Sequence, residues 1–277
     1  MAGILGVFDS GIGGFSVIRE MRDLLPAHPL IYLADQAHVP YGARSLEEVR
    51  LYSVAITRFL IDRGARLIVV ACNTASAAAL HDLRSEFPAV RFVGMEPAVK
   101  PAAEITRTGV VGVLATPATF QGELYNSVVE RFAGGVTILQ DTCPGLVEQI
   151  EHGRLDDTVT RAILQRSIQP MLEKGIDTIV LGCTHYPFVI PLIQEIAGEG
   201  VRVIDPAPAI ARQVRRLLLQ EGLLCEGNRN VEDVFFTTGD LASFACSLRW
   251  CWNGSAASIK TIHWQDGRLI QPRSDLI

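Results

Sequence analysis

The segments Leu67–Ser76, LIVVACNTAS, and Thr178–Pro187, TIVLGCTHYP, decide the fold. Each is typical of a buried strand that ends in a small residue and a cysteine, followed by polar residues and a helix. A second pair, GVFDSG at Gly6–Gly11 and GVLATP at Gly112–Pro117, recurs at a similar distance along the chain. Strands of one parallel sheet can look alike, but that alone does not explain the matched cysteines. The pattern therefore favours two copies of one βα module.

Short apolar runs alternate with helical periodicity along most of the chain, which predicts an α/β fold with mostly parallel sheets. We expect strands at Ile4–Phe8, Leu30–Ala34, Leu67–Ala71, Phe92–Gly94, Val110–Leu114, Val136–Leu139, Thr178–Leu181, Val201–Ile204 and Val234–Thr237. We expect helices at Gly14–Leu25, Ser45–Arg63, Ala75–Glu86, Thr119–Ala133, Pro144–His152, Thr158–Glu173, Phe188–Ile196 and Ala207–Leu219. The two prolines of EPAVKP predict a domain boundary near Pro97–Pro101. The pattern leaves open whether the tail beyond Ala207 returns to the first copy.

Length, composition and charge exclude several classes of protein. The chain has 277 residues, of which 48% are hydrophobic and 20% charged, with a net charge of −5. At ~150 residues per domain this length fits about two domains with real cores, which excludes disorder and collagen-like repeats. Apolar runs end well short of the ~20 residues that a bilayer span needs. The mild acidity and the lack of a Lys/Arg run argue against nucleic-acid and membrane-surface partners.

Cysteine usage and the N-terminal sequence predict a cytoplasmic protein. No export signal is visible at the start, and six cysteines in a chain of this kind are expected to be reduced. No metal site of convincing spacing is found, because Cys183 and His185 have no second Cys/His pair to complete a tetrahedron. We therefore expect neither a metal nor an organic cofactor.

The two strand-end cysteines, Cys72 and Cys183, carry the predicted chemistry. Ligands of open α/β sheets bind at the carboxyl ends of strands, so both thiols are expected at the functional edge of their own sheet. A helix N-terminus next to each thiol is expected to lower its pKa below the free value of ~8.5. Two thiols across one cleft can remove a proton from a carbon and return one from the opposite side. That reaction inverts a stereocentre.

Polar residues near the same strand ends are candidates for assisting this reaction. Asp9 and His185 can handle the protons of Cys72 and Cys183, respectively. The glycine turn after Asp9, helix N-termini, and hydroxyl or amide donors could hold a substrate carboxylate; the donors are Ser10, Asn73, Thr74, Thr119 and Thr184.

Simpler roles stay open for these residues at this stage. Asp9 and Ser10 could cap the first helix, His185 could be structural, and the glycines could serve chain geometry alone. Local sequence does not choose between Glu148 and Glu151, while Cys143 is expected to be structural.

Seven motifs occur in order along the chain: GVFDSGIGGFSVIREM, YLADQAHVPYGARSLEEV, VVACNTASA, ATPATFQGELY, CPGLVEQIE, LGCTHYPFV and VIDPAPAIA. In order and near spacing they resemble the motifs of bacterial glutamate racemases, in the aspartate/glutamate racemase family, over about residues 3 to 215. The resemblance implies cofactor-independent interconversion of L- and D-glutamate, which supplies D-glutamate for peptidoglycan. It also implies a homodimer and two similar αβα domains, related by pseudo-twofold symmetry, with the active site in the cleft between them. Their expected extents are 1–97 plus 208–277, and 98–207.

The resemblance also implies roles for single residues. Cys72 is expected to face D-glutamate and Cys183 to face L-glutamate, with Asp9, His185 and Glu151 as assisting groups. The positions expected to contact substrate are Ser10, Asp35, Tyr41, Gly42, Asn73, Thr74, Thr119 and Thr184.

Three other functions are weighed against this one. An aspartate racemase is the nearest, although the residues after each cysteine resemble the glutamate branch. A nicotinamide-dependent dehydrogenase is suggested by Gly11, Gly13 and Asp35, but Ser16 stands where the dinucleotide fingerprint requires a third glycine. In a non-catalytic amino-acid-binding protein both cysteines would be passive.

Overall fold

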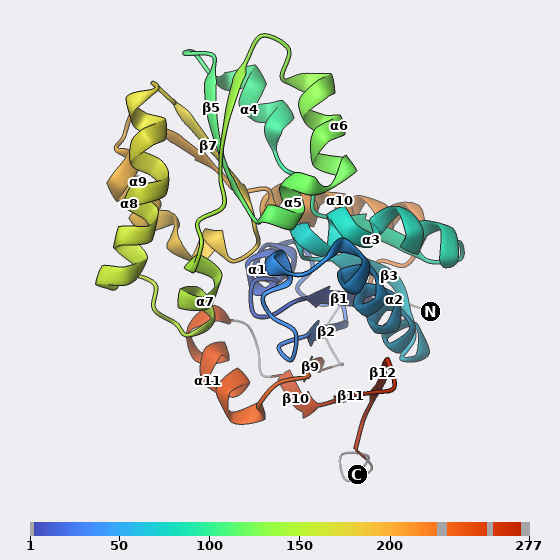
Figure 1. Cartoon of the computed structure of the whole chain (residues 1–277). Helices are drawn as coiled ribbons and strands as arrows, with labels where there is room; N and C mark the ends of the chain where they lie inside the picture. The colour runs from blue at the N-terminus through green and yellow to red at the C-terminus, as the bar shows by residue number, and fades with distance from the viewer. Residues whose placement is uncertain (1–2, 226–231, 254–256, 273–277) are drawn as a thin grey trace.

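Two parallel β-sheets, each covered by helices, build the molecule (Figure 1). The computed structural model describes residues 3–225, 232–253 and 257–272. Sheet A has the strand order β10-β9-β2-β1-β3-β4, with every adjacent pair parallel. Its strands are β1 (Ile4–Asp9), β2 (Leu30–Ala34), β3 (Ala65–Val70), β4 (Arg91–Gly94), β9 (Asp233–Thr237) and β10 (Ala257–Thr261).

Sheet B has the order β6-β5-β7-β8 and is also parallel throughout. Its strands are β5 (Val110–Ala115), β6 (Thr137–Asp141), β7 (Thr178–Gly182) and β8 (Arg202–Ile204). A separate antiparallel pair, β11 (His263–Gln265) and β12 (Arg268–Ile270), follows sheet A near the C-terminus. The two similar α/β units expected from the sequence are therefore confirmed at the level of the fold.

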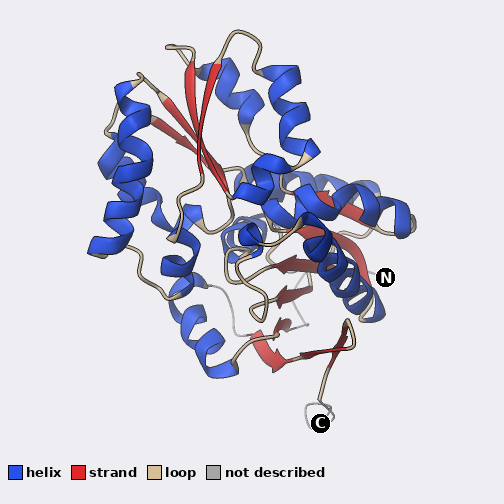
Figure 2. Cartoon of the chain, in the orientation of Figure 1, coloured by secondary structure: helices blue, strands red, loops and turns tan. Residues whose placement is uncertain are grey.

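Helices lie on both faces of each sheet, which explains why the central strands are apolar without alternation (Figure 2). On sheet A, α1 (Phe15–Leu24), α10 (Ala207–Gln220) and α11 (Leu241–Cys251) pack on one face, and α2 (Leu46–Asp62) and α3 (Asn73–Glu86) on the other. On sheet B, α7 (Leu146–Glu151), α8 (Thr158–Glu173) and α9 (Ile190–Ala197) cover one face, and α4 (Val99–Ile105) and α6 (Glu123–Phe132) the other. Short helices α5 (Pro117–Gln121), η1 (Tyr41–Ala43) and η2 (Tyr186–Val189) lie in connections.

The tail beyond Ala207 returns to the first unit. Strand β9 pairs with β2, and α10 and α11 share a core with α1. The guanidinium of Arg22 on α1 donates to both carboxylate oxygens of Asp233 at 2.9 Å, which ties the returning strand to the N-terminal helix. Residues 4–94 and 233–261 thus supply sheet A, and 110–204 supply sheet B. The precise domain boundaries near 97 and 207 stay a prediction.

Several helix bounds differ from the sequence-based expectation. The expected helix Thr119–Ala133 is two helices, because the backbone at Gly122 is extended and separates α5 from α6. The expected helix Phe188–Ile196 begins as the 3-10 turn η2, in which Pro187 sits at the first turn. Only a domain boundary was expected in the proline-rich segment that contains α4, and α11 and β10–β12 were not expected from the sequence.

Candidate active site

The carboxyl ends of both sheets meet at one small buried cavity. Strands β1 and β3 of sheet A and β5 and β7 of sheet B end beside it, as expected for ligand sites of parallel sheets. The free volume is about 10 Å³, about the room of one water molecule. In this structure the cavity is therefore too small for a ligand larger than a water molecule. Its lining residues are Ser10, Pro40, Tyr41, Gly42, Cys72, Asn73, Thr74, Thr116, Val147, Cys183, Thr184 and His185.

Cys72 lies at the start of α3 on the sheet A side of the cavity. Its Sγ accepts the backbone N–H of Ala75 at 3.4 Å, so the thiol is the N-cap of the helix. Burial nevertheless raises the pKa of Cys72 well above its ordinary value, and the carboxylate of Asp9 raises it further. The expectation of a lowered pKa at this thiol is wrong, because desolvation outweighs the helix N-terminus.

Cys183 directly follows β7 on the sheet B side of the cavity, and a buried relay of proton-carrying groups leads away from it. Its Sγ lies 3.9 Å from Nδ1 of His185, and Nε2 of His185 lies 2.7 Å from Oε1 of Glu151. The carboxylate of Glu151 also accepts the N–H of Ile12 at 2.8 Å and the side-chain amide of Gln36 at 3.2 Å. The structure thus joins Glu151, and not the exposed Glu148, to the strand-end cysteine.

The ionisation of this relay is set by its own hydrogen bonds. Burial alone would lower the pKa of His185, but the bonds to Cys183 and Glu151 and their negative charges raise it well above its ordinary value. Burial alone would raise the pKa of Glu151, but His185, Ile12 and Gln36 lower it. An imidazolium beside a carboxylate is therefore the favoured state of the pair at neutral pH.

Asp9 is fully buried at the end of β1 and faces the second sheet. Its Oδ2 accepts the hydroxyl of Thr184 at 2.8 Å, and its Oδ1 accepts the backbone N–H and the hydroxyl of Ser10. Burial raises the pKa of Asp9, while the positive charge of His185 and the bond from Thr184 oppose the rise. Helix α1 is capped at Gly14 without a side-chain bond, so Asp9 and Ser10 do not cap it. Asp9 influences Cys72 through its charge.

The glycine turn after Asp9 makes room for groups of the second sheet. A Cβ on Gly11 would lie 1.9 Å from Oε1 of Glu151, and one on Gly13 would lie 2.5 Å from Nδ1 of His185. The backbone N–H of Ile12 in this turn donates to Oε1 of Glu151 at 2.8 Å. The turn thus allows the relay to reach sheet A.

Side-chain hydroxyls and one amide complete the cavity wall. The hydroxyl of Thr116 lies 2.8 Å from that of Thr74 and 2.9 Å from that of Thr119. Thr116 was not expected from the sequence, although its position after β5 and before α5 matches that of the cysteines after β3 and β7. Among the described residues, the buried amide of Asn73 has neither its oxygen nor its nitrogen hydrogen-bonded. An unpartnered amide in this wall is suited to a polar ligand.

The remaining predicted contact residues occupy the loop after β2. Tyr41 and Gly42 line the cavity, and a Cβ on Gly42 would lie 2.6 Å from Cβ of Thr116. Asp35 is fully buried behind the loop and is not among the described residues that line the cavity. Its carboxylate instead accepts bonds from Tyr41 and three other donors. Cys143 is buried under α7, and burial raises its pKa to about 12.

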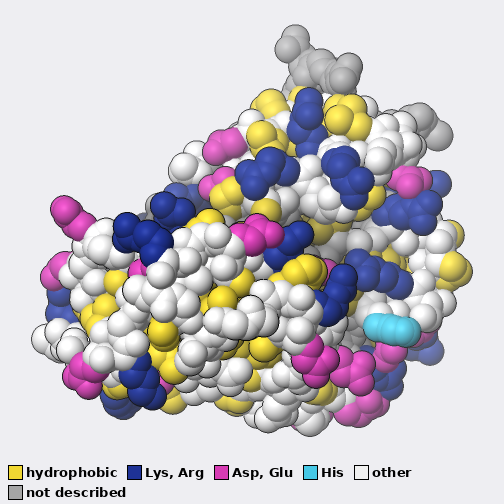
Figure 3. All heavy atoms as spheres, turned by 90° about the horizontal axis from the view of Figure 1, so that it is seen from above, with side chains coloured by type: hydrophobic (Ala, Val, Ile, Leu, Met, Phe, Trp, Pro, Cys, Tyr) yellow, Lys and Arg dark blue, Asp and Glu magenta, His cyan; other side chains and the backbone are white. Residues whose placement is uncertain are grey.

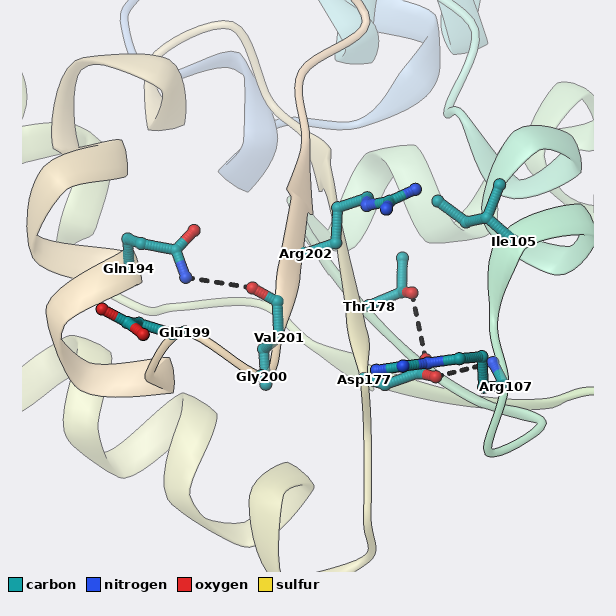
Figure 4. A pocket seen from close by; sticks show the side chains of 9 residues that line it. All are labelled: Ile105, Arg107, Asp177, Thr178, Gln194, Glu199, Gly200, Val201 and Arg202. Atoms are coloured by element: carbon teal, nitrogen blue, oxygen red, sulfur yellow. Dashed lines mark hydrogen bonds between the residues drawn. The ribbon is translucent and has the colours of Figure 1, made fainter.

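A larger hollow of about 530 Å³ lies at the opposite, amino end of β7 and β8 (Figure 4). Some of its polar side chains bond to other groups of the chain. Asp177 accepts the hydroxyls of Thr106 and Thr178, and Gln194 donates to the carbonyl of Val201. This hollow holds none of the thiols, so we do not assign the site to it.

Basic and acidic side chains are interspersed on the face seen in Figure 3. No helix in the described ranges has both the length and the apolar character needed to cross a bilayer. Within those ranges, no group of three or more His, Cys, Asp or Glu side chains is arranged to hold a metal ion.

Comparisons with known proteins show which sequences this chain resembles. Residues 13–214 match the family model described as Asp/Glu/Hydantoin racemase. The chain is 54% identical over 246 residues to a glutamate racemase of Roseiflexus sp. (strain RS-1), covering 87% of this chain and 89% of the relative.

Two solved structures share the architecture. One is a glutamate racemase of Escherichia coli in complex with L-glutamate and the activator UDP-MurNAc-ala, at 33% identity and a TM-score of 0.83 over 95% of this chain and 99% of that one. The other is a glutamate racemase isoform of Bacillus anthracis, at 31% identity and a TM-score of 0.83 over 96% of this chain and 98% of that one.

Proposed function

Because the chain belongs to the Asp/Glu/hydantoin racemase family, we propose that it interconverts L- and D-glutamate with its own side chains and no cofactor. It is an amino-acid racemase. The observation that carries the two-base mechanism is that Cys72 and Cys183 follow the carboxyl ends of strands from different sheets and line one cavity. The mechanism needs one sulfur on each side of the substrate Cα.

In this mechanism the two thiols exchange roles with the direction of reaction. When L-glutamate reacts, the thiolate of Cys183 removes the Cα proton and becomes a thiol. The thiol of Cys72 then gives its proton to the opposite face of the carbanion and becomes a thiolate. D-glutamate reacts by the same steps in reverse. Each turnover moves one proton onto a sulfur and one off the other, so no net oxidation occurs.

The neighbouring groups reset the thiols between turnovers. His185 can exchange a proton with Cys183 because its Nδ1 lies 3.9 Å from Sγ, and Glu151 stabilises the imidazolium form. The charge of Asp9 acts on Cys72, whose raised pKa makes it a proton donor in its resting state. Holding one thiol protonated is what the reaction from L-glutamate needs.

The rest of the cavity wall is assigned to substrate binding. The free amide of Asn73 and the hydroxyls of Ser10, Thr74, Thr119 and Thr184 supply the polar atoms, and Tyr41 and Gly42 close the wall from the loop after β2. We add Thr116, whose hydroxyl joins those of Thr74 and Thr119. Asp35 belongs to this group through its bond with Tyr41.

The cellular setting follows from the same assignment. We propose that the product D-glutamate serves peptidoglycan synthesis and that the enzyme acts in the cytoplasm as a homodimer. The six cysteines all lie in described residues and are all free, which supports a reducing compartment. Sedimentation of the purified protein tests the dimer, since a monomer across the working concentration range would contradict it.

Proton exchange at Cα is the direct test of the function. In heavy water, L-glutamate is expected to give D-glutamate that carries deuterium at Cα, measured by chiral chromatography with mass detection. Turnover of aspartate but not glutamate would favour the aspartate racemase instead. Inversion without any solvent label would contradict the two-base mechanism.

A further inference from the structure

The C-terminal hairpin of β11 and β12 reaches a carboxylate that lies directly behind the cavity wall. Nε1 of Trp264 on β11 donates to Oδ1 of Asp35 at 2.7 Å. The side chain of Asp35 is completely buried, whereas Trp264 is half-buried. A hairpin outside both parallel sheets thus makes a charge-assisted bond in the interior.

Asp35 gathers donors from three separate parts of the chain. Its Oδ2 accepts the hydroxyl of Tyr41 at 2.6 Å and lies 2.9 Å from Nδ1 of His38. Its Oδ1 accepts the hydroxyl of Thr238 at 2.8 Å in addition to the bond from Trp264. A buried carboxylate is tolerated only when such donors satisfy it, so its position depends on all of them. One oxygen is held from the loop after β2 and the other from the C-terminal segment.

Ring contacts reinforce the same connection. The ring of Trp264 lies 5.2 Å from that of His38 and 5.4 Å from that of Tyr52, between centroids. His38 stacks on Tyr52 at 4.0 Å with an angle of 11° between the ring planes. The indole therefore restrains the loop through packing as well as through its N–H.

The restrained loop forms part of the cavity wall. Pro40, Tyr41 and Gly42 line the cavity, and Gly42 packs closely against Thr116 from sheet B. Tyr41 donates its hydroxyl to Asp35, so a shift of that carboxylate moves the loop against the opposite sheet.

We propose that Trp264 is a positioning residue of the active site, which acts through Asp35 and Tyr41 to fix the 40–42 loop around the bound amino acid. The inference rests on the proposed function, because the loop is taken as a wall of the substrate site. It gives the C-terminal hairpin a role in substrate affinity and leaves the chemical step to the cysteines.

The test is a Trp264→Phe variant of the full chain, which keeps an aromatic ring and removes the N–H donor. We expect KM for L- and D-glutamate to rise about fivefold with kcat within about twofold, since a misplaced wall weakens binding in ground and transition states alike. His263→Ala, an exposed neighbour on the same strand, is the matched control and should leave both constants unchanged. Thr238→Val removes the other donor to Oδ1 from a different element and should reproduce the rise in KM.

A double-mutant cycle separates positioning from a general loss of folding. In a Tyr41→Phe background the link from Asp35 to the loop is cut, so Trp264→Phe should change KM by less than about twofold further. Equal and independent effects in both backgrounds would overturn the proposal, as would a fall in kcat alone that matches the loss of folded protein by circular dichroism. If wild-type protein racemises glutamate and Trp264→Phe behaves like wild type, only this inference fails. If wild-type protein racemises no glutamate, the proposed function fails.

Discussion

Nε2 of His185 and Oε1 of Glu151 lie 2.7 Å apart at the point where the second sheet meets the glycine turn of the first. His185 follows β7 and Glu151 ends α7, while the N–H of Ile12, which also bonds this carboxylate, belongs to the turn after β1. The relay behind Cys183 is therefore completed only where both α/β units touch.

The charge of Glu151 should set the alkaline limit of activity. Glu151 raises the pKa of His185, so Glu151→Gln should lower that pKa and let the imidazolium be lost at lower pH. We expect the alkaline limb of kcat/KM to move down by about one pH unit, a size typical of one nearby opposite charge. Glu148→Gln, one helical turn away on the exposed side of α7, should leave the limb in place. An unshifted limb in Glu151→Gln would show that His185 does not control it.

The ionised pair of His185 and Glu151 should stabilise the folded protein most over a defined pH range. The raised pKa of His185 contributes stability that is complete below the ordinary value of 6.5 and is lost as pH rises through the raised value. The lowered pKa of Glu151 contributes stability that is complete above 4.5 and is lost as pH falls through the lowered value. The difference in urea midpoint between wild type and Glu151→Gln should thus be largest between pH 4.5 and 6.5. A difference that grows outside this window would contradict the assignment.

Gly11→Ala should damage activity more than stability. The added Cβ would lie 1.9 Å from Oε1 of Glu151, so the carboxylate must leave its place beside His185. Displacement of a catalytic group by about 1 Å costs about 100-fold in rate, whereas local overpacking costs about 1–3 kcal/mol of stability. Gly200→Ala is the control, because nothing lies within 4 Å of its added Cβ. Kinetics and urea unfolding measure both quantities, and near-normal kcat/KM in Gly11→Ala would exclude the close approach.

The positions of the two cysteines in the candidate site were predictable from the sequence because the two βα modules repeat. Apolar strands that end in cysteine placed Cys72 and Cys183 at carboxyl ends, where the structure has them. The choice between Glu148 and Glu151 was beyond local pattern, since it depends on which side of α7 faces the other sheet. Thr116 was missed because a threonine after a strand is common and carries no signal until its partners are known.

The features that the sequence predicted wrongly or left open are set by their tertiary surroundings. The pKa of Cys72 was expected to be lowered by α3, but local sequence does not reveal the burial that raises it. The hairpin at residues 263–270 has little apolar alternation, and its long-range contacts include the bond from Trp264 to Asp35 and the packing of Trp264 and Leu269 against the core. The sequence also left open whether the tail returns to sheet A, because that depends on the pairing of β9 with β2.

The return of the tail should make Asp233 a large contributor to stability. Its carboxylate is fully buried and accepts two bonds from Arg22, whose side chain is only 13% exposed. Asp233→Ala removes a buried carboxylate that accepts two bonds from the guanidinium, which should lower the free energy of unfolding by about 3–5 kcal/mol. Glu195→Ala removes a partner of Arg161 at the surface and should cost at most about 1 kcal/mol. Equal effects of the two variants in urea titrations would rule out a special role for the Arg22–Asp233 pair.

Replacing Cys72 or Cys183 should abolish racemisation but leave proton exchange at Cα on one face of the substrate. Cys72→Ala and Cys183→Ala are each expected to lower kcat by about 10³-fold or more, because inversion needs a donor and an acceptor on opposite faces. The remaining thiol can still remove and return a proton on its own face. In heavy water, Cys72→Ala should therefore exchange the Cα proton of L-glutamate without inversion, and Cys183→Ala that of D-glutamate. Cys225→Ala, outside the cavity lining, should behave like wild type. Exchange of both enantiomers by a single-cysteine variant would mean that one thiol reaches both faces, which is incompatible with a cavity that holds one sulfur from each sheet.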